Sequence, residues 1–130
     1  IIEANIKGRE VTNGIFRNKE GLKTLPITEI ISENEYFDYE AKYNGKSKEI
    51  TPADFSKEVT QKIKSLTSFI YKTLDMNGLA RMDYIINKNN ILFLIEINSV
   101  PGMSKESIIP QMIKEDNKLI KNILSEIINI

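Results

Sequence analysis

The chain has 130 residues, 41% of them hydrophobic, which is enough for one packed domain or a piece of a larger one. Its 18 basic and 18 acidic side chains balance, which argues against a nucleic acid or an anionic membrane surface as a partner. Cysteine and histidine are both absent, so any chemistry must rest on carboxylates, lysine, arginine and backbone amides.

The first part of the chain predicts strands and a loop. Strands are expected at residues 1–6, 10–17 and 25–31, with Lys7-Gly8-Arg9 joining the first two. Residues 34–43 are aromatic and charged without a period, which is typical of a loop. Because the chain starts without methionine and within a strand-like pattern, we expect it to be a fragment cut inside a sheet.

A helix is predicted to begin at Thr51. Thr at the N-cap, Pro52 at the first helical position and Asp54 three residues past the cap are typical of a helix start. The apolar residues that follow step by three or four and form one core-facing stripe, which ends at Asn77-Gly78. They are Phe55, Val59, Ile63, Leu66, Ile70 and Leu74. This helix is predicted to be scaffold.

Two apolar strands, residues 78–86 and 91–98, are separated by a connection short enough for a hairpin. In the first, Arg81 and Asp83 share one face. In the second strand, alternate residues form two faces: one comprises Leu92, Leu94, Glu96 and Asn98, and the other comprises Ile91, Phe93, Ile95 and Ile97. Both faces begin with apolar residues typical of a buried strand, and only the first becomes polar. A carboxylate on a buried face needs a partner, and the hairpin is expected to bring Asp83 near Glu96.

These oxygen-bearing side chains predict a magnesium site formed by Asp83, Glu96 and Asn98. Magnesium in proteins is typically held by one or two carboxylates together with the phosphates of a nucleotide. The alternative interpretation makes Asp83 a surface strand residue and pairs Glu96 with Arg81 in a structural salt bridge.

The C-terminal part predicts a tight turn at Pro101-Gly102, where glycine tolerates a positive φ, and a last helix at residues 118–128. The inner face of that helix is expected to comprise Leu119, Ile120, Ile123, Leu124, Ile127 and Ile128. The order of elements predicts an α+β fold with helices packed on a mostly antiparallel sheet. The longest apolar run, residues 91–95, is too short to span a membrane, so a cytoplasmic protein without a membrane partner is expected.

Neither GxxxxGK[ST] nor GxGxxG occurs, which excludes the common phosphate-binding loops from this segment. Five ordered blocks, IIEANIKGREVT, YFDYEAKY, ITPA, GLARMDYII and LIEINSVPGMSKESIIP, resemble the ATP-grasp carboxylate-amine ligases and, within them, the D-alanine:D-alanine ligase family. The resemblance covers nearly the whole chain. It implies that residues 1–130 are the C-terminal part of an ATP-grasp catalytic domain whose upstream domains are absent.

The resemblance also implies roles for single residues. Arg81 and the Gly102 amide would stabilise the oxyanion of the tetrahedral intermediate. Nucleotide contacts would come from Glu3, the backbone near Ile6, Glu10 for the ribose, and Lys42 for the γ-phosphate. The second substrate would be bound by Tyr43, Ser107 and the Ile108 amide. From the residues alone, Glu3 and Glu10 could equally be exposed strand residues, Lys42 a solvated loop lysine and Ser107 a helix cap.

The reaction implied by the resemblance joins two D-alanine molecules through an acyl phosphate, for peptidoglycan precursor synthesis. ATP would be the co-substrate, with two Mg²⁺ ions or Mn²⁺ in their place, and the full-length protein would be compatible with a homodimer. Two alternatives stay open: another ATP-grasp ligase with different substrates, and a nucleotide- and magnesium-binding module that is inactive as an isolated chain.

Overall fold

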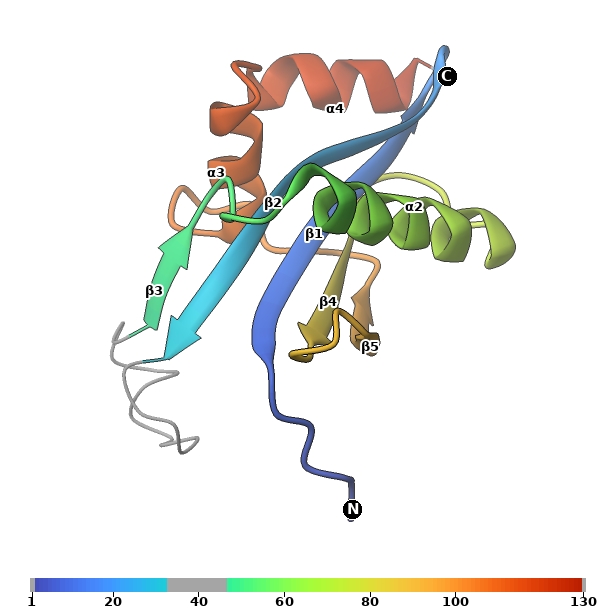
Figure 1. Cartoon of the computed structure of the whole chain (residues 1–130). Coiled ribbons are helices and arrows are strands. Elements are labelled where there is room, and N and C mark those ends of the chain that lie inside the picture. Colours follow the sequence, from blue (N-terminus) through green and yellow to red (C-terminus); the bar gives the residue numbers. More distant parts are fainter. Residues whose placement is uncertain (1, 33–46, 130) are drawn as a thin grey trace.

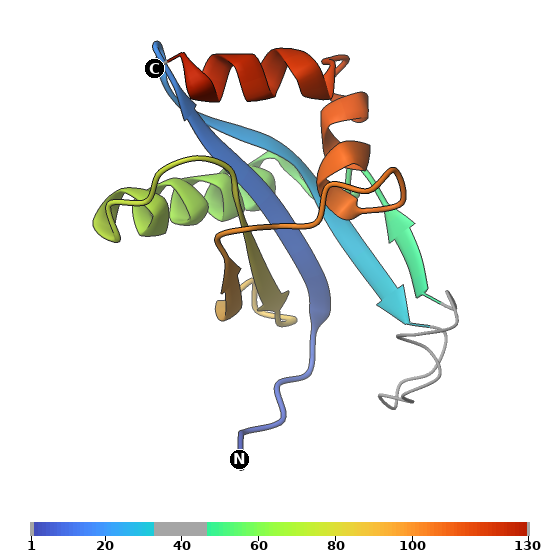
Figure 2. The ribbon, with the colours of Figure 1, turned by 180° about the vertical axis from the view of Figure 1, so that it is seen from behind.

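The computed structural model describes residues 2–32 and 47–129 and contains a five-stranded antiparallel sheet (Figure 1). Its strand order is β3-β2-β1-β4-β5. The strands are β1 (Arg9–Asn18), β2 (Gly21–Ser32), β3 (Ser47–Ile50), β4 (Ala80–Ile86) and β5 (Leu92–Asn98). Helix α2 (Lys57–Thr73) lies on one face of the sheet, and α3 (Ile108–Glu115) and α4 (Ile120–Ile128) lie on the other (Figure 2). The predicted α+β class is therefore confirmed.

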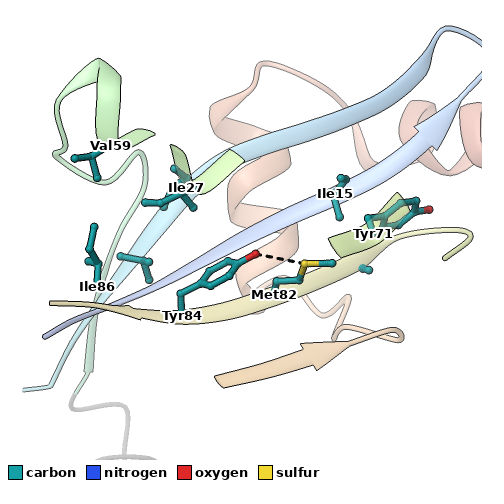
Figure 3. Close-up of a cluster of buried hydrophobic side chains, with 10 residues drawn as sticks. Ile15, Ile27, Val59, Tyr71, Met82, Tyr84 and Ile86 are labelled. Carbon is teal, nitrogen blue, oxygen red and sulfur yellow. Dashed lines mark hydrogen bonds between the residues drawn. The ribbon is translucent and has the colours of Figure 1, made fainter. Parts of the chain in front are cut away.

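Each face of the sheet has its own apolar core. The cluster under α2, most of which is drawn in Figure 3, consists of Val11, Ile15, Ile27, Val59, Ile63, Tyr71, Ala80, Met82, Tyr84 and Ile86. The cluster under α3 and α4 consists of Phe16, Leu25, Ile109, Met112, Ile113 and Ile123. Because both faces of β1 and β2 are covered, the central strands are held in place from two sides.

An irregularity between β1 and β2 lets α3 approach the sheet. The register shifts between Asn13 and Ile15, so that two residues of β2 lie opposite Gly14. A Cβ atom on Gly14 would lie only 2.7 Å from Ile109 Cδ1, so the missing side chain makes room for α3. Asn13 Nδ2 donates a 2.8 Å hydrogen bond to the Leu25 carbonyl within the bulge. The site described below lies beside this point.

The N-terminal prediction was wrong in part. Residues 2–7 form no strand, and the side chain of Ile2 is fully exposed. An apolar strand pattern forms a strand only where another strand supplies hydrogen bonds, and none is paired with this segment among the described residues. The short, polar strand β3 was missed because Ser47-Lys48-Glu49-Ile50 has no strand pattern of its own.

Helix α2 begins later than predicted. Its N-cap is Ser56, whose side chain accepts a hydrogen bond from the Val59 amide, whereas Thr51 precedes the helix. The Thr51 hydroxyl is 2.6 Å from that of Thr28, and the Ala53 amide donates to the Ile27 carbonyl at 2.8 Å. Because residues of β2 form hydrogen bonds with the Thr51 hydroxyl and the Ala53 amide, residues 51–55 follow the sheet instead of starting a helix.

The C-terminal prediction was correct for the last helix, within two residues at its start, and incomplete for the segment before it. Helix α3 was missed, and α4 begins at Ile120. Of the predicted inner-face residues only Ile123 is fully buried, with Ile120 and Ile127 packed beside it, while Leu119, Leu124 and Ile128 are exposed. The predicted inner face was too wide because α3 already covers much of this face of the sheet. No helix in the described part of the chain is long and apolar enough to cross a membrane.

Candidate functional site

A patch of polar side chains lies on the hairpin of β4 and β5. Asp83 lies directly opposite Glu96 in the register of the two strands, and Arg81 lies directly opposite Asn98. Residues directly opposite each other in antiparallel strands share a face of the sheet, so these four side chains gather on the face opposite α2. The prediction that the hairpin brings Asp83 near Glu96 is confirmed.

The prediction of which residues share a face of the second strand was wrong. The register of the hairpin shifts between Asp83 and Tyr84, so that Ile95 is an extra residue in β5. Leu94 is therefore opposite Tyr84, on the α2 face, while Glu96 is opposite Asp83 on the other face. The bulge thus separates an apolar half of β5 from its polar end.

Strand β5 is also less buried than predicted. It is at one edge of the described sheet, and Leu94 and Ile95 are 42% and 53% exposed. Glu96 is exposed as well. The argument that Glu96 needs a partner because its strand is buried on both faces therefore does not hold within these residues.

Arg81 and Asp83 form a two-point ion pair within β4. Arg81 Nε donates to Asp83 Oδ1 at 3.0 Å, and Nη2 donates to Oδ2 at 2.9 Å. Their side chains are 20% and 16% exposed, so the pair is partly shielded from water. The alternative pairing of Arg81 with Glu96 is not the one observed. Such a fork-to-fork contact fixes the orientation of both planar groups.

The donor set fits magnesium chemically. Asp83 and Glu96 supply carboxylates, and Asn98 supplies an amide oxygen that already accepts a 3.1 Å hydrogen bond from the Val100 amide. Within residues 2–32 and 47–129, no three acidic, histidine or cysteine side chains come close enough to hold a metal ion alone. Two carboxylates with an amide match the usual case, in which phosphates complete the magnesium shell. Metal binding by these residues stays a prediction.

Strand β1 extends the polar patch on the other side of β4. Thr12 lies opposite Asp83, Gly14 opposite Arg81, and Glu10 opposite Ile85. Glu10 and Thr12 therefore share the face of Asp83, which places the predicted ribose ligand Glu10 beside the patch. Sequence reasoning missed Thr12, which is fully buried and whose hydroxyl has no partner among the described residues. Its position two residues after Glu10 in the same strand was the available signal.

The connection from β5 to α3 crosses β1 on this face (Figure 2). A Cβ atom on Gly102 would lie 2.9 Å from Ser107 Oγ. Among the described glycines only Gly21 and Gly78 have a positive φ, so the positive φ predicted for Gly102 was wrong. The missing side chain of Gly102 instead provides space beside Ser107. We expect the close approach to keep the Gly102 amide near the start of α3.

Ser107 is the N-cap residue of α3, and Ile108 is its first residue. The Ser107 side chain makes no capping bond and instead shares a 2.8 Å hydrogen bond with the Ser104 hydroxyl. Amides in the first turn of a helix have no partner within the helix, which makes them donors for an anion. Substrate binding by Ser107 and Ile108 stays a prediction.

The remaining predicted ligands are not gathered by the structure. Glu3 is exposed and Ile6 half-buried in the N-terminal stretch that runs away from the sheet (Figures 1 and 2). Lys42 and Tyr43 lie outside the described residues.

Comparisons with known proteins give a family match over nearly the whole chain. Residues 1–129 match the family described as D-ala D-ala ligase C-terminus. A D-alanine–D-alanine ligase from Azobacteroides pseudotrichonymphae is 47% identical over 129 residues, which are 98% of this chain and 40% of the relative. The chain thus spans about 40% of the length of the curated relatives it matches first.

Two solved structures are similar to the fold. The D-alanine–D-alanine ligase from Bacillus anthracis complexed with ATP superposes with a TM-score of 0.76 at 31% identity, covering 96% of this chain and 40% of that one. The D-Ala:D-Ser ligase VanG from Enterococcus faecalis superposes with a TM-score of 0.78 at 26% identity, covering 96% and 36%.

Proposed function

Because the chain belongs to the D-ala D-ala ligase C-terminus family, we propose that it is the C-terminal catalytic part of an ATP-dependent ligase joining two D-alanine molecules. The observation that carries the proposal is the convergence of Arg81, Asp83, Glu96 and Asn98 on one face of the β4–β5 hairpin. This patch supplies acidic ligands for a nucleotide-bound cation next to a cationic group for the reacting substrate. The product would serve peptidoglycan precursor synthesis in the cytoplasm.

The proposed reaction has two steps. A carboxylate oxygen of the first D-alanine attacks the γ-phosphorus of ATP, forming an acyl phosphate and releasing ADP. The amine of the second D-alanine then attacks the acyl carbon, loses a proton, and phosphate leaves. Magnesium held by Asp83, Glu96 and Asn98, as two ions or with Mn²⁺ in their place, would neutralise charge on the phosphates.

The hydrogen bonds of Arg81 support a role for its guanidinium in stabilising charge on the substrate. Its ion pair with Asp83 uses Nε and one terminal nitrogen, which leaves other N–H groups of the guanidinium free to donate. Asp83 orients the guanidinium through both bonds, so the free donors have a defined direction. We propose that they contact the oxygen on which negative charge develops, together with the Gly102 amide.

The second D-alanine would bind where α3 begins. Its carboxylate would accept hydrogen bonds from the Ile108 amide and the Ser107 hydroxyl, at the positive end of the helix dipole. Lys42 and Tyr43 would complete the sites for the γ-phosphate and the second substrate, and Glu3, Ile6 and Glu10 would bind the nucleoside. This arrangement supports recognition of a small amino acid by its carboxylate.

The test is an assay of the full-length protein that contains this chain. We expect phosphate release from ATP that depends on D-alanine and magnesium, with D-alanyl-D-alanine detected by mass spectrometry. Glu96→Gln should raise the concentration of magnesium that is needed and leave the fold intact. ATP turnover without any dipeptide would contradict the proposal and favour a binding module or another ATP-grasp ligase.

A panel of second substrates separates the closest alternative. One structural neighbour is a D-Ala:D-Ser ligase, so D-alanine, D-serine and D-lactate should be compared as acceptors. We expect D-alanine to give the highest kcat/KM. Size-exclusion chromatography with light scattering would test the proposed homodimer in the same preparation.

A further inference from the structure

Within residues 2–32 and 47–129, the buried hydroxyl group of Thr12, in strand β1, has no hydrogen-bond partner. Its side chain is fully buried, and Oγ1 makes no hydrogen bond among the described residues. A buried polar group without a partner is costly, so one in a native fold calls for a functional reason. The same is true of Asn13 Oδ1, but the amide nitrogen of Asn13 already bonds to Leu25 within the bulge.

The position of Thr12 relates its hydroxyl to the polar patch. Thr12 is paired with Asp83 on one side and with Thr28 on the other. The Thr28 hydroxyl is already bonded to that of Thr51 at 2.6 Å. Side chains of directly opposite residues begin about 5 Å apart, so a hydroxyl on Thr12 is within reach of the Asp83 carboxylate. Of these two opposite neighbours, Asp83 carries the charged group and is therefore the stronger acceptor for the Thr12 hydroxyl.

In this structure Asp83 is turned to Arg81 instead. Both carboxylate oxygens accept from Arg81, at 3.0 and 2.9 Å. Each carboxylate oxygen can accept more than one hydrogen bond, so Asp83 can keep Arg81 oriented and still accept from Thr12 when it binds a cation. A carboxylate that holds a cation generally keeps a second hydrogen-bond partner, which fixes its orientation.

We infer that Thr12 is a positioning residue of the cation site, whose hydroxyl donates to the Asp83 carboxylate when Asp83 binds the cation. The inference rests on the proposed function, because it takes Asp83 to be a cation ligand. It gives a functional reason for a buried hydroxyl that makes no hydrogen bond among the described residues. Thr12 acts only through Asp83 and touches neither substrate nor cation.

The experiment compares Thr12→Val with Thr12→Ser in the full-length protein. Affinity for Mn²⁺ is measured by electron paramagnetic resonance in the presence of ADP, and the unfolding midpoint by calorimetry. Thr12→Val keeps the shape and removes the hydroxyl, so we expect Mn²⁺ affinity to fall roughly tenfold or more while the midpoint stays the same or rises. Thr12→Ser keeps the hydroxyl and loses a buried methyl group, so affinity should be retained and the midpoint lowered.

Thr28→Val is the matched control. It removes a buried hydroxyl from the same row of the sheet, but one already bonded to Thr51. We expect it to lower the unfolding midpoint and to leave Mn²⁺ affinity unchanged, opposite to the effects of Thr12→Val.

The outcomes separate this inference from the function on which it rests. If Glu96→Gln weakens Mn²⁺ binding and Thr12→Val does not, the role of Thr12 is overturned and the cation site stands. If Thr12→Val and Thr12→Ser weaken binding equally and both lower the midpoint, Thr12 acts through packing and the inference is wrong. If the protein binds no Mn²⁺ with ADP, the inference and the proposed cation site fall together.

Discussion

The two faces of strand β4 carry opposite kinds of side chains. One face holds four residues that are almost completely buried under α2, and the other holds Arg81 and Asp83, which are partly exposed and paired with each other. The buried residues are Ala80, Met82, Tyr84 and Ile86. Because side chains alternate along a strand, a single element provides both the core and the candidate site. Substitutions at neighbouring positions should therefore affect different properties.

The hydroxyl groups of Tyr84 and Thr12, on opposite faces, also differ in how fully they are hydrogen-bonded. Under α2, the Tyr84 hydroxyl is 2.9 Å from that of Thr67, which donates to the Ile63 carbonyl at 3.0 Å. On the other face, the Thr12 hydroxyl has no partner in the described part of the chain, and the Asp83 carboxylate accepts hydrogen bonds from Arg81. Complete hydrogen bonding is typical of groups that stabilise a fold, whereas unfilled capacity is typical of groups that await a ligand.

Arg81→Ala should have the largest effect on activity. We expect kcat of the full-length protein to fall about a hundredfold or more, because a donor to developing charge is lost. The KM for ATP should change much less. Steady-state phosphate release at saturating substrates gives both parameters.

Thermal unfolding of the same variant is the control, since Arg81 lies outside the apolar cores and its loss should shift the midpoint little. A normal kcat would rule out the proposed role of Arg81. A collapse of stability would mean that the Arg81–Asp83 pair is structural.

Met82→Ala should have the opposite profile. Met82 is fully buried in the cluster under α2, so its truncation should lower the free energy of unfolding by about 2–5 kcal/mol. At temperatures well below the midpoint, kcat should stay near the wild-type value. Urea unfolding and the phosphate assay measure the two effects separately. A loss of kcat at full occupancy of the folded state would show that the two faces are not independent.

How well the sequence predicted the fold differs from element to element. The β4–β5 hairpin was predicted with its Asp83–Glu96 neighbourhood because the apolar runs and the short connection are local signals. The start of α2 was placed at Thr51, since local capping signals do not show that β2 binds the Thr51 hydroxyl and the Ala53 amide. Tertiary hydrogen bonds took precedence over local preference there.

The candidate site was predictable in type and less so in geometry. The residue types of Asp83, Glu96 and Asn98 indicated a cation site, but the bulge at Ile95 that places them on one face has no sequence signature in an apolar run. The role of Thr12 also depends on register, because only the pairing of β1 with β4 sets it opposite Asp83. Threonine is common in strands, so its presence alone carries no functional signal.

Tyr84→Phe tests the buried face of β4 through the pH dependence of the protein's stability. Burial raises the pKa of Tyr84 to about 12, against a weaker lowering by the Thr67 hydrogen bond. The folded protein then holds the tyrosine proton more tightly than the unfolded chain does, so the stabilisation is complete below pH 10 and is lost as pH rises toward 12. We expect wild-type stability to fall across this window by about 1–3 kcal/mol from Tyr84.

In Tyr84→Phe that part of the pH dependence should disappear, at a cost near neutral pH of about 1 kcal/mol for the lost hydroxyl. Urea unfolding at a series of pH values from 8 to 12 provides the measurement. An unchanged slope between pH 10 and 12 in the variant would assign the dependence to another group. Tyr71, whose pKa burial also raises, is the first to examine.

Ile95→Thr should have the smallest effect and tests the edge of the sheet. Ile95 is the bulged residue of β5 and about half exposed, whereas Ile97, two residues later, packs against the cluster under α2. Threonine keeps the branched shape that strands favour, so the substitution removes apolar contact with little change in strand preference. In the 130-residue chain, Ile95→Thr should change the free energy of unfolding by less than about 0.5 kcal/mol, and Ile97→Thr should cost about 1–2 kcal/mol. Urea unfolding at two protein concentrations measures both.

If Ile95→Thr costs as much as Ile97→Thr, and more at the higher concentration, the exposed edge is covered by a second copy of the chain, as an unpaired strand edge allows. If Ile95→Thr costs as much as Ile97→Thr at both concentrations, Ile95 is buried within the chain. That result would contradict the contrast between the edge strand and the core.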